Sequence, residues 1–293
     1  MNKGLTLTVI SKMTSNYGEG LGNISSIQKV FRNGRTYGTR SRESLKNAIM
    51  VQSGLYDDLK VVVDGATQKD VSEEYNASNC RALEGGYMNT TGLTKIRKSS
   101  FYLTDAVSCD EFVNETRFHN NLYLASTYAK ANGINLQEKS KESGLMPYQY
   151  EYDLNLKQYS ITIDLDRIGK DENFNTESSK EEKVDRVNAL LTAIENLNLV
   201  VKGNLDNAEP LFIVGGIGDS KTHYFDNVVR TKGGELSINK DLKERISKGY
   251  NIAILEGDNF ANEDEIIREL NPDTITAFFE KLRSDVRTYY GLS

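Results

Sequence analysis

Segments far apart in the sequence alternate apolar and polar residues, and this pattern constrains the fold more than any other feature. Residues 5–9 alternate leucine and valine with threonine, and residues 159–165 alternate in the same way. A period of two is typical of a half-buried β-strand. Residues 250–254 predict another strand, and the apolar run 211–214 predicts a short buried one that ends at Gly215.

Three helices are predicted between and after these strands, because apolar residues recur there at helical spacing. Ser41 is placed as the N-cap of the first helix, with Glu43 in its first turn. Ser179 and Glu182 form a capping box before the second helix, and Asn271-Pro272 opens the last one. Strands interleaved with amphipathic helices on one side predict an α+β sandwich of the ferredoxin-like kind.

One long internal stretch, residues 59–149, has weak periodicity and short β-like pieces separated by polar residues. We interpret it as a single insertion emerging from a core formed by residues 1–58 and 150–293. A helix is predicted near Glu111–Ala131, with Gly133 ending it.

Positive charge is concentrated near the N-terminus of a chain whose formal net charge is −6. Residues 29–46 contain six basic side chains and one acidic side chain, Glu43, which gives this segment a local charge of +5. Such segregation is what a polyanion site needs, although a solvated charged loop is the alternative. Phe31 and Tyr37 stand among the arginines, where rings can stack on bases. The six basic residues are Lys29, Arg32, Arg35, Arg40, Arg42 and Lys46.

A glycine-dotted loop precedes the basic run, with Gly18, Gly20 and Gly22. Glycine there either lets backbone amides approach a ligand or simply makes a turn. Downstream, Arg42 and Lys46 are four residues apart and share one ridge near a helix N-terminus, where backbone amides also favour an anion.

Other chemistries have few residues to support them. Cys80 and Cys109 do not make a disulfide framework, which favours a reducing cytoplasm. Together with His119 they lack the paired short spacings of structural zinc, so no metal or cofactor is predicted. No stretch approaches the roughly 18 apolar residues of a membrane span, so no membrane partner is predicted.

The segment GGIGDSKT, residues 215–222, resembles a phosphate-binding P-loop only in part. Ser220 replaces the second glycine, and the next residues read as extended instead of helical. We interpret Gly215–Leu236 as a projecting hairpin that returns at Gly233-Gly234. Its basic residues include Lys221, His223 and Arg230.

Several segments resemble a known family: KMTSNYGEGLGNISSIQK (12–29), TRSRESLKNAI (39–49) and the P-x-F-I-V-G-G corner (210–216). They are similar to the CRISPR-associated crRNA-backbone proteins of the RAMP superfamily, above all the type I-B branch also called the DevR-type autoregulator family. The likeness is strongest over 4–58 and clear over 156–230.

This resemblance implies an RRM-like palm over 1–58 and 150–293, a finger insertion over 59–149 and a thumb hairpin over 215–236. Copies would stack head to tail along one guide RNA (crRNA) as a helical filament, beside other subunits of a Cascade surveillance complex that serves antiviral defence. Target DNA would be recognised by pairing with the guide, so the protein would grip phosphates without reading bases. The residues expected to contact RNA are Lys12, Asn16, Tyr17, Lys29, Arg32, Arg35, Tyr37, Arg40, Ser41, Arg42, Lys46, Lys221, His223 and Arg230.

No convincing catalytic set accompanies these residues, so a non-enzymatic RNA-binding role is predicted. Two alternatives stay open. Type III relatives cut RNA with a loop aspartate, and Asp57-Asp58 is the acidic pair near the basic run. The autoregulator name suggests a DNA-binding regulator, although the sequence has no helix-turn-helix pattern.

Overall fold

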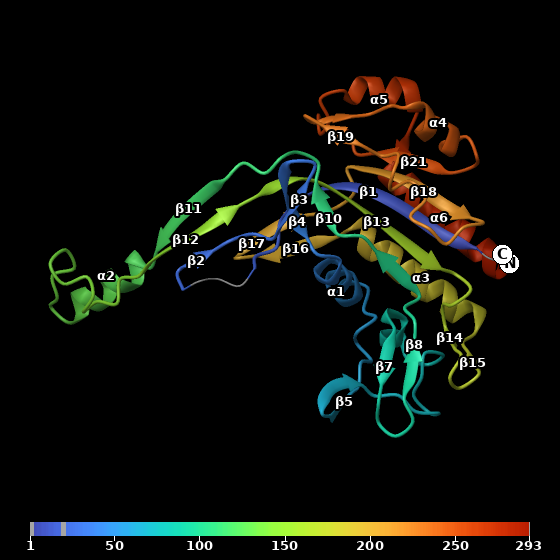
Figure 1. The fold of residues 1–293 in the computed structure, drawn as a ribbon, viewed down its shortest axis with the longest axis horizontal. Coiled ribbons are helices and arrows are strands. Elements are labelled where there is room, and N and C mark those ends of the chain that lie inside the picture. The colour runs from blue at the N-terminus through green and yellow to red at the C-terminus, as the bar shows by residue number, and fades with distance from the viewer. Residues whose placement is uncertain (1–2, 19–21, 293) are drawn as a thin grey trace.

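A nine-stranded mixed sheet runs through the centre of the protein (Figure 1). The computed structural model describes residues 3–18 and 22–292. The strand order is β22-β21-β18-β1-β13-β10-β4-β3, and β9 also pairs with β13. The strands of this sheet are β1 (Gly4–Thr14), β3 (Lys29–Arg32), β4 (Arg35–Arg40), β9 (Phe101–Leu103), β10 (Ala106–Ser108), β13 (Leu154–Asp164), β18 (Phe212–Gly218), β21 (Asn251–Ile254) and β22 (Asp273–Thr274).

The two long central strands confirm the strands predicted at 5–9 and 159–165. β1 and β13 pair antiparallel in register from Gly4↔Asp164 to Thr14↔Leu154. Their alternation does not leave one face in solvent, because Thr6 and Thr8 are also buried. Residues 219–230, which we call the covering segment, lie over this polar face. Its Tyr224 amide donates to Thr6 Oγ1 at 3.3 Å. The prediction of half-buried strands is therefore wrong.

Three helices pack on the apolar face of the sheet and form the main core with it. They are α1 (Arg42–Gln52), α3 (Lys180–Glu195) and α6 (Ile275–Tyr290). Ser41 and Ser179 cap the first two as predicted. The third begins later than predicted, because Thr274 is its N-cap and Asn271 instead ends a preceding helix in the left-handed conformation.

A smaller second core covers the other face at the β18–β21 end of the sheet. It includes Phe225, Val228 and Val229 of the covering segment. Two short helices that the sequence reading missed, α4 (Lys240–Ile246) and α5 (Glu263–Leu270), lie at this end of the molecule (Figure 1).

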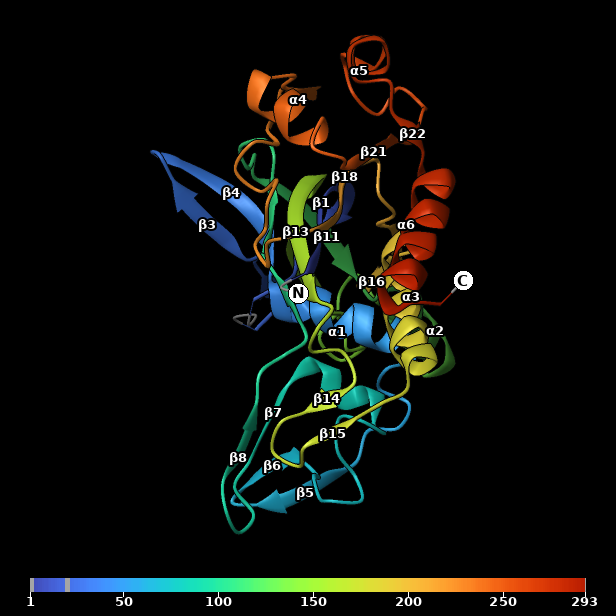
Figure 2. The ribbon, with the colours of Figure 1, turned by 90° about the vertical axis from the view of Figure 1, so that its right-hand side faces the viewer.

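The stretch 59–149 is not one insertion, because β9 and β10 return to the central sheet. Residues 60–100 form one projection, which we call the lobe, and residues 111–152 form a second, which we call the arm (Figures 1 and 2). The lobe contains β5 (Val61–Asp64), β6 (Ala66–Lys69), η1 (Arg81–Gly85), β7 (Tyr87–Asn89) and β8 (Lys95–Arg97).

The arm is a long hairpin that carries a helix at its tip (Figure 1). Strand β11 (Glu115–Asn120) pairs with β12 (Pro147–Tyr152), which also pairs with β2 (Ile24–Ser25). The tip helix is α2 (Leu122–Ala131). The first half of the helix predicted at 111–131 is therefore a strand, because it finds a partner about thirty residues away.

The interpretation of Gly215–Leu236 as one projecting hairpin is wrong. Residues 215–218 belong to β18, which lies between β1 and β21. A side chain at Gly215 would bring its Cβ within 2.0 Å of the Thr6 carbonyl oxygen, so glycine is needed there for close packing and not as a hinge. Only β19 (Thr231–Lys232) and β20 (Glu235–Leu236) form a hairpin, with Gly233 and Gly234 at its turn. The remaining strands are β14 (Lys170–Asp171), β15 (Thr176–Glu177), β16 (Asn198–Val201) and β17 (Asn204–Asn207).

Candidate nucleic-acid interface

Two open clefts meet on the polar side of the sheet, beside the N-terminus of α1. Their volumes are about 630 Å³ and about 580 Å³. Both are lined by Arg42 and Leu103, so the two clefts adjoin, and we call them together the groove. Of the residues predicted to contact RNA, six line this groove: Arg32, Arg42, Lys46, Lys221, His223 and Arg230.

Helix α1 presents two of these side chains. The Ser41 hydroxyl accepts a hydrogen bond from the Ser44 amide at 3.3 Å and fixes the start of the helix. Arg42, in the first turn, is exposed and makes a 2.8 Å ion pair with the neighbouring Glu43. An exposed pair of this kind contributes little to stability, so the Arg42 guanidinium can exchange Glu43 for another anion at low cost.

Lys46, one turn further along α1, is anchored at the junction with the lobe. Its ammonium donates to the Gly85 carbonyl at 2.8 Å and to Ser99 Oγ at 3.0 Å. Burial lowers the pKa of this lysine. Its ammonium therefore joins the lobe to the core as well as lining the groove.

The covering segment forms the opposite wall. Lys221 donates to the carboxylates of Asp164 and Asp166 at 2.6 and 2.9 Å. Although burial acts in the other direction, these hydrogen bonds hold the pKa of Lys221 above its ordinary value. His223 Nδ1 lies 2.9 Å from Thr162 Oγ1, and burial lowers the His223 pKa against the opposing effect of Asp226. The imidazole is therefore neutral near pH 7.

Arg230 closes the far end of the groove. Its Nη1 donates to the backbone carbonyls of Asp226 and Val229, both at 2.6 Å. Since those acceptors are uncharged, the positive charge of Arg230 is not neutralised by them. Five basic and three acidic side chains line the whole groove, a net charge of +2 with His223 neutral.

Other predicted residues do not line the groove, and two of them have partners elsewhere. Tyr17 donates to the Glu151 carbonyl at 2.8 Å, and Asn16 Oδ1 accepts the Ser41 amide at 2.9 Å. Burial and the neighbouring Tyr150 raise the pKa of Tyr17 to about 12. Lys12 is exposed on β1, and Tyr37 is half-buried on β4. Gly20, between Gly18 and Gly22, lies outside the described part of the chain.

The six basic residues of the run therefore do not share one cleft. Lys29 pairs with Glu151 at 2.6 Å, and Arg35 lies 3.8 Å from Glu111. Arg40 is buried and donates to the Thr14 carbonyl, so its role is structural. Three of the six remain as groove residues: Arg32, Arg42 and Lys46.

The two strands of the arm carry an aromatic row that the sequence reading missed. His119 stacks between Tyr148 and Tyr150, with ring centroids 5.5 and 5.0 Å away. Tyr150 meets Tyr17 edge to face, and Lys202 lies over both tyrosine rings at 4.6 and 5.3 Å. The signal was present in the sequence, because tyrosines at 148, 150 and 152 alternate on one face of a strand.

The nuclease alternative depends on Asp57-Asp58, and Asp58 has a structural role in the part of the chain that is described. Within residues 3–18 and 22–292 no group of three His, Cys, Asp or Glu side chains is placed to hold a metal. The Asp58 carboxylate accepts the backbone amides of Arg81 and Ala82 at 2.7 and 3.0 Å and so anchors η1. The cysteines are both free, and no helix in the described part is long and apolar enough to cross a membrane.

The family model described as CRISPR-associated negative auto-regulator DevR/Csa2 matches residues 6–225, about three quarters of the chain. The chain belongs to this CRISPR-associated family. The resemblance seen in the sequence is thereby confirmed at the level of the family. No curated protein sequence matches the chain significantly.

Solved structures share the fold of this DevR/Csa2-family chain. A chain of a "CRISPR RNA-guided surveillance complex, pre-nicking" is 12% identical with a TM-score of 0.56, over 87% of this chain and 93% of that one. A chain of a "CRISPR RNA-guided surveillance complex" is 12% identical with a TM-score of 0.53, over 98% of both chains. These likenesses support the mixed α and β architecture. The RRM-like palm stays a prediction, and the bounds predicted for the finger and the thumb are the ones corrected above.

Proposed function

We propose that this chain is a non-enzymatic backbone subunit that binds guide RNA within a cytoplasmic type I Cascade surveillance complex. The observation that carries the proposal is the groove, which gathers Arg32 of β3, Arg42 of α1 and Arg230 of the covering segment. A groove with a positive net charge in an acidic protein confines binding of a polyanion to one face. The DevR/Csa2 family match and the surveillance-complex fold support the same role.

Copies of the chain would line up head to tail along the guide, with other Cascade subunits at the ends and target DNA paired to the guide. The arm is the element suited to reach a neighbouring copy, because it projects from the body (Figure 1). It also exposes apolar side chains. We therefore assign the role of the thumb to the arm instead of residues 215–236. The lobe takes the place of the finger.

The test is the nucleic acid that the purified chain carries. A guide-binding subunit should co-purify with RNA, show a high 260/280 nm absorbance ratio and form oligomers that ribonuclease shortens. A clean monomer with no affinity for RNA at low salt would overturn the proposal. Tight binding to one defined DNA duplex in preference to RNA would favour a regulator instead, and regular cuts in guide-paired RNA with Mg²⁺ would favour a nuclease.

A further inference from the structure

The groove contains a carboxylate that its cationic neighbours do not neutralise. Asp105 stands between β9 and β10, and lines the same cleft as Arg32, Arg42 and Arg230. Its Oδ1 accepts the backbone amide of Arg42 at 2.9 Å. Within the described residues Asp105 makes no ion pair, and this is its one hydrogen bond, so Oδ2 is left without a donor.

The other two acids of the groove have different surroundings. Glu43 is exposed and pairs with the Arg42 guanidinium. Asp226 accepts the Ser160 hydroxyl at 2.9 Å, which ties the covering segment to the sheet. Asp105 differs from Glu43 because it makes no ion pair within the described residues. It differs from Asp226 because a backbone amide at the start of α1, that of Arg42 itself, fixes its position; like Asp226, it keeps one oxygen available to a ligand.

A fixed carboxylate is unfavourable for a bound phosphate strand unless the strand offers it a hydrogen-bond donor. Phosphate oxygens only accept hydrogen bonds at neutral pH, and the backbone of DNA has no donor. The ribose 2′-hydroxyl of RNA is a donor, and it is the group that distinguishes the two backbones at a given site. A hydrogen bond to an ionised acceptor is among the stronger ones, and leaving that acceptor covered without a donor is costly.

We propose that Asp105 is a specificity residue, which accepts a hydrogen bond from a ribose 2′-hydroxyl and so makes the groove select RNA over DNA. This inference depends on the proposed function, because it concerns the same groove. The arginines that line the same cleft hold the phosphates, and the Asp105 carboxylate recognises the sugar. The selection is independent of base sequence, as a subunit that accepts any guide requires.

The first test uses the unaltered chain with three single strands of one sequence at one salt concentration: RNA, DNA and RNA carrying 2′-fluoro groups. The 2′-fluoro strand keeps the ribose-like sugar shape but cannot donate a hydrogen bond. We expect DNA and 2′-fluoro RNA to bind about tenfold more weakly than RNA. Equal binding of RNA and 2′-fluoro RNA overturns the inference and leaves the proposed function standing. Absence of RNA binding overturns both.

The second test compares Asp105→Ala with the matched control Glu43→Gln, which removes an equal charge from the same groove. Asp105→Ala should reduce the ratio of RNA to DNA affinity about tenfold. The RNA complex loses the hydrogen bond from its 2′-hydroxyl, whereas the DNA complex loses only the electrostatic repulsion between carboxylate and phosphate. Glu43→Gln should tighten both strands by a similar factor and keep the ratio. An unchanged ratio in Asp105→Ala overturns the inference. If the alanine variant does not fold, Asp105→Asn is used in its place, because asparagine keeps an oxygen for the Arg42 amide. A reduced ratio of RNA to DNA affinity then supports the inference, and an unchanged ratio overturns it.

Discussion

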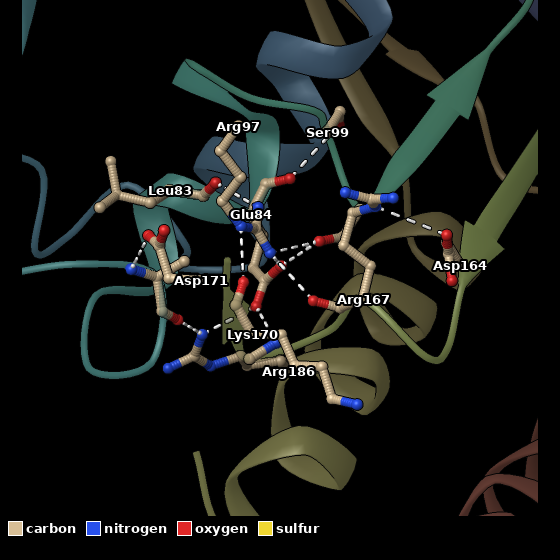
Figure 3. A network of polar contacts seen from close by, with 12 residues as sticks. Leu83, Glu84, Arg97, Ser99, Asp164, Arg167, Lys170, Asp171 and Arg186 are labelled. Carbon is tan, nitrogen blue, oxygen red and sulfur yellow. Dashed lines mark hydrogen bonds and ion pairs between the residues drawn. The ribbon is translucent and has the colours of Figure 1, made fainter. Parts of the chain in front are cut away.

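Glu84 and Arg186 form an ion pair of 2.7 Å between two fully buried side chains that are 102 residues apart in the sequence (Figure 3). Arg97 approaches the other oxygen of Glu84 at 3.1 Å. The same carboxylate accepts the Gly169 amide at 2.7 Å. Glu84 and Arg97 belong to the lobe, whereas Arg186 lies on α3, so this network fixes the lobe to the core.

Replacing Glu84 by glutamine should therefore destabilise the whole chain. The change leaves two buried guanidinium groups without their shared carboxylate, a loss of about 3–5 kcal/mol in the free energy of unfolding. Urea titration followed by circular dichroism measures it. Glu269→Gln is the matched control, because its pair with Lys243 is about 40% exposed and its loss should leave stability almost unchanged. Equal effects of the two substitutions would contradict this account of the network.

Alanine substitution of Arg40 should lower stability, whereas alanine substitution of Arg42, two residues away, should lower RNA affinity. Arg40 donates two hydrogen bonds to the Thr14 carbonyl, at 3.0 and 2.9 Å, and is buried. Arg40→Ala should lower the free energy of unfolding by about 2 kcal/mol, because the Thr14 carbonyl loses both donors. Arg42→Ala should leave stability within about 0.5 kcal/mol and weaken binding of any RNA sequence about equally.

Thermal melting and RNA titration at several salt concentrations separate the two effects. Loss of the Arg42 charge should flatten the dependence of affinity on salt, since fewer counterions are released. If Arg42→Ala weakened only certain sequences, base recognition would be the better explanation of its role.

These arginines also mark how far the sequence could predict the site. Charge spacing located the segment that supplies three basic residues of the groove, and period-two alternation located β1 and β13. The turn at Asn33-Gly34, where both residues have positive φ, is a hairpin signal that would have assigned β3 and β4 and shown that Arg40 lies on a strand. No local signal could have indicated that Arg230 or Asp105 joins Arg42, because pairing of distant strands brings them together.

The same limit explains the errors in the fold. The residues of β11 have helix-compatible composition, and only their pairing with β12 makes them a strand. The glycines of β18 resemble a hinge in the sequence, yet Gly215 is required by the close approach of β1. In both cases a partner distant in the chain overrides the local pattern.

The stability of the chain should rise with pH between about pH 8 and pH 10 because of Lys69. Burial and the nearby Lys46 lower the pKa of Lys69 to about 8. Its pKa in the unfolded chain is about 10.4, so the unfolded state binds more protons in this window and stability increases with pH. We expect Lys69 to contribute an increase of about 2 kcal/mol across this window. Urea titrations at both ends of the window measure it, and Lys69→Met should remove it. An equal rise in the variant would assign the effect to other groups.

The apolar tip of the arm should control assembly on RNA without affecting the fold. Helix α2 buries only Ala125 and Ala129 within the described chain, while Tyr123 and Leu124 are 84% and 67% exposed. Large exposed apolar side chains on a projecting element are typical of an interaction surface. The double substitution Tyr123→Ser and Leu124→Ser should therefore leave the melting temperature unchanged and reduce the number of copies bound per long RNA, as sedimentation measures it. The affinity for an RNA too short for two copies should not change.

Leu93→Ser, at an 82% exposed position of the lobe, is the control for loss of an exposed leucine. Full-length arrays formed by the arm variant would show that neighbouring copies meet through another surface.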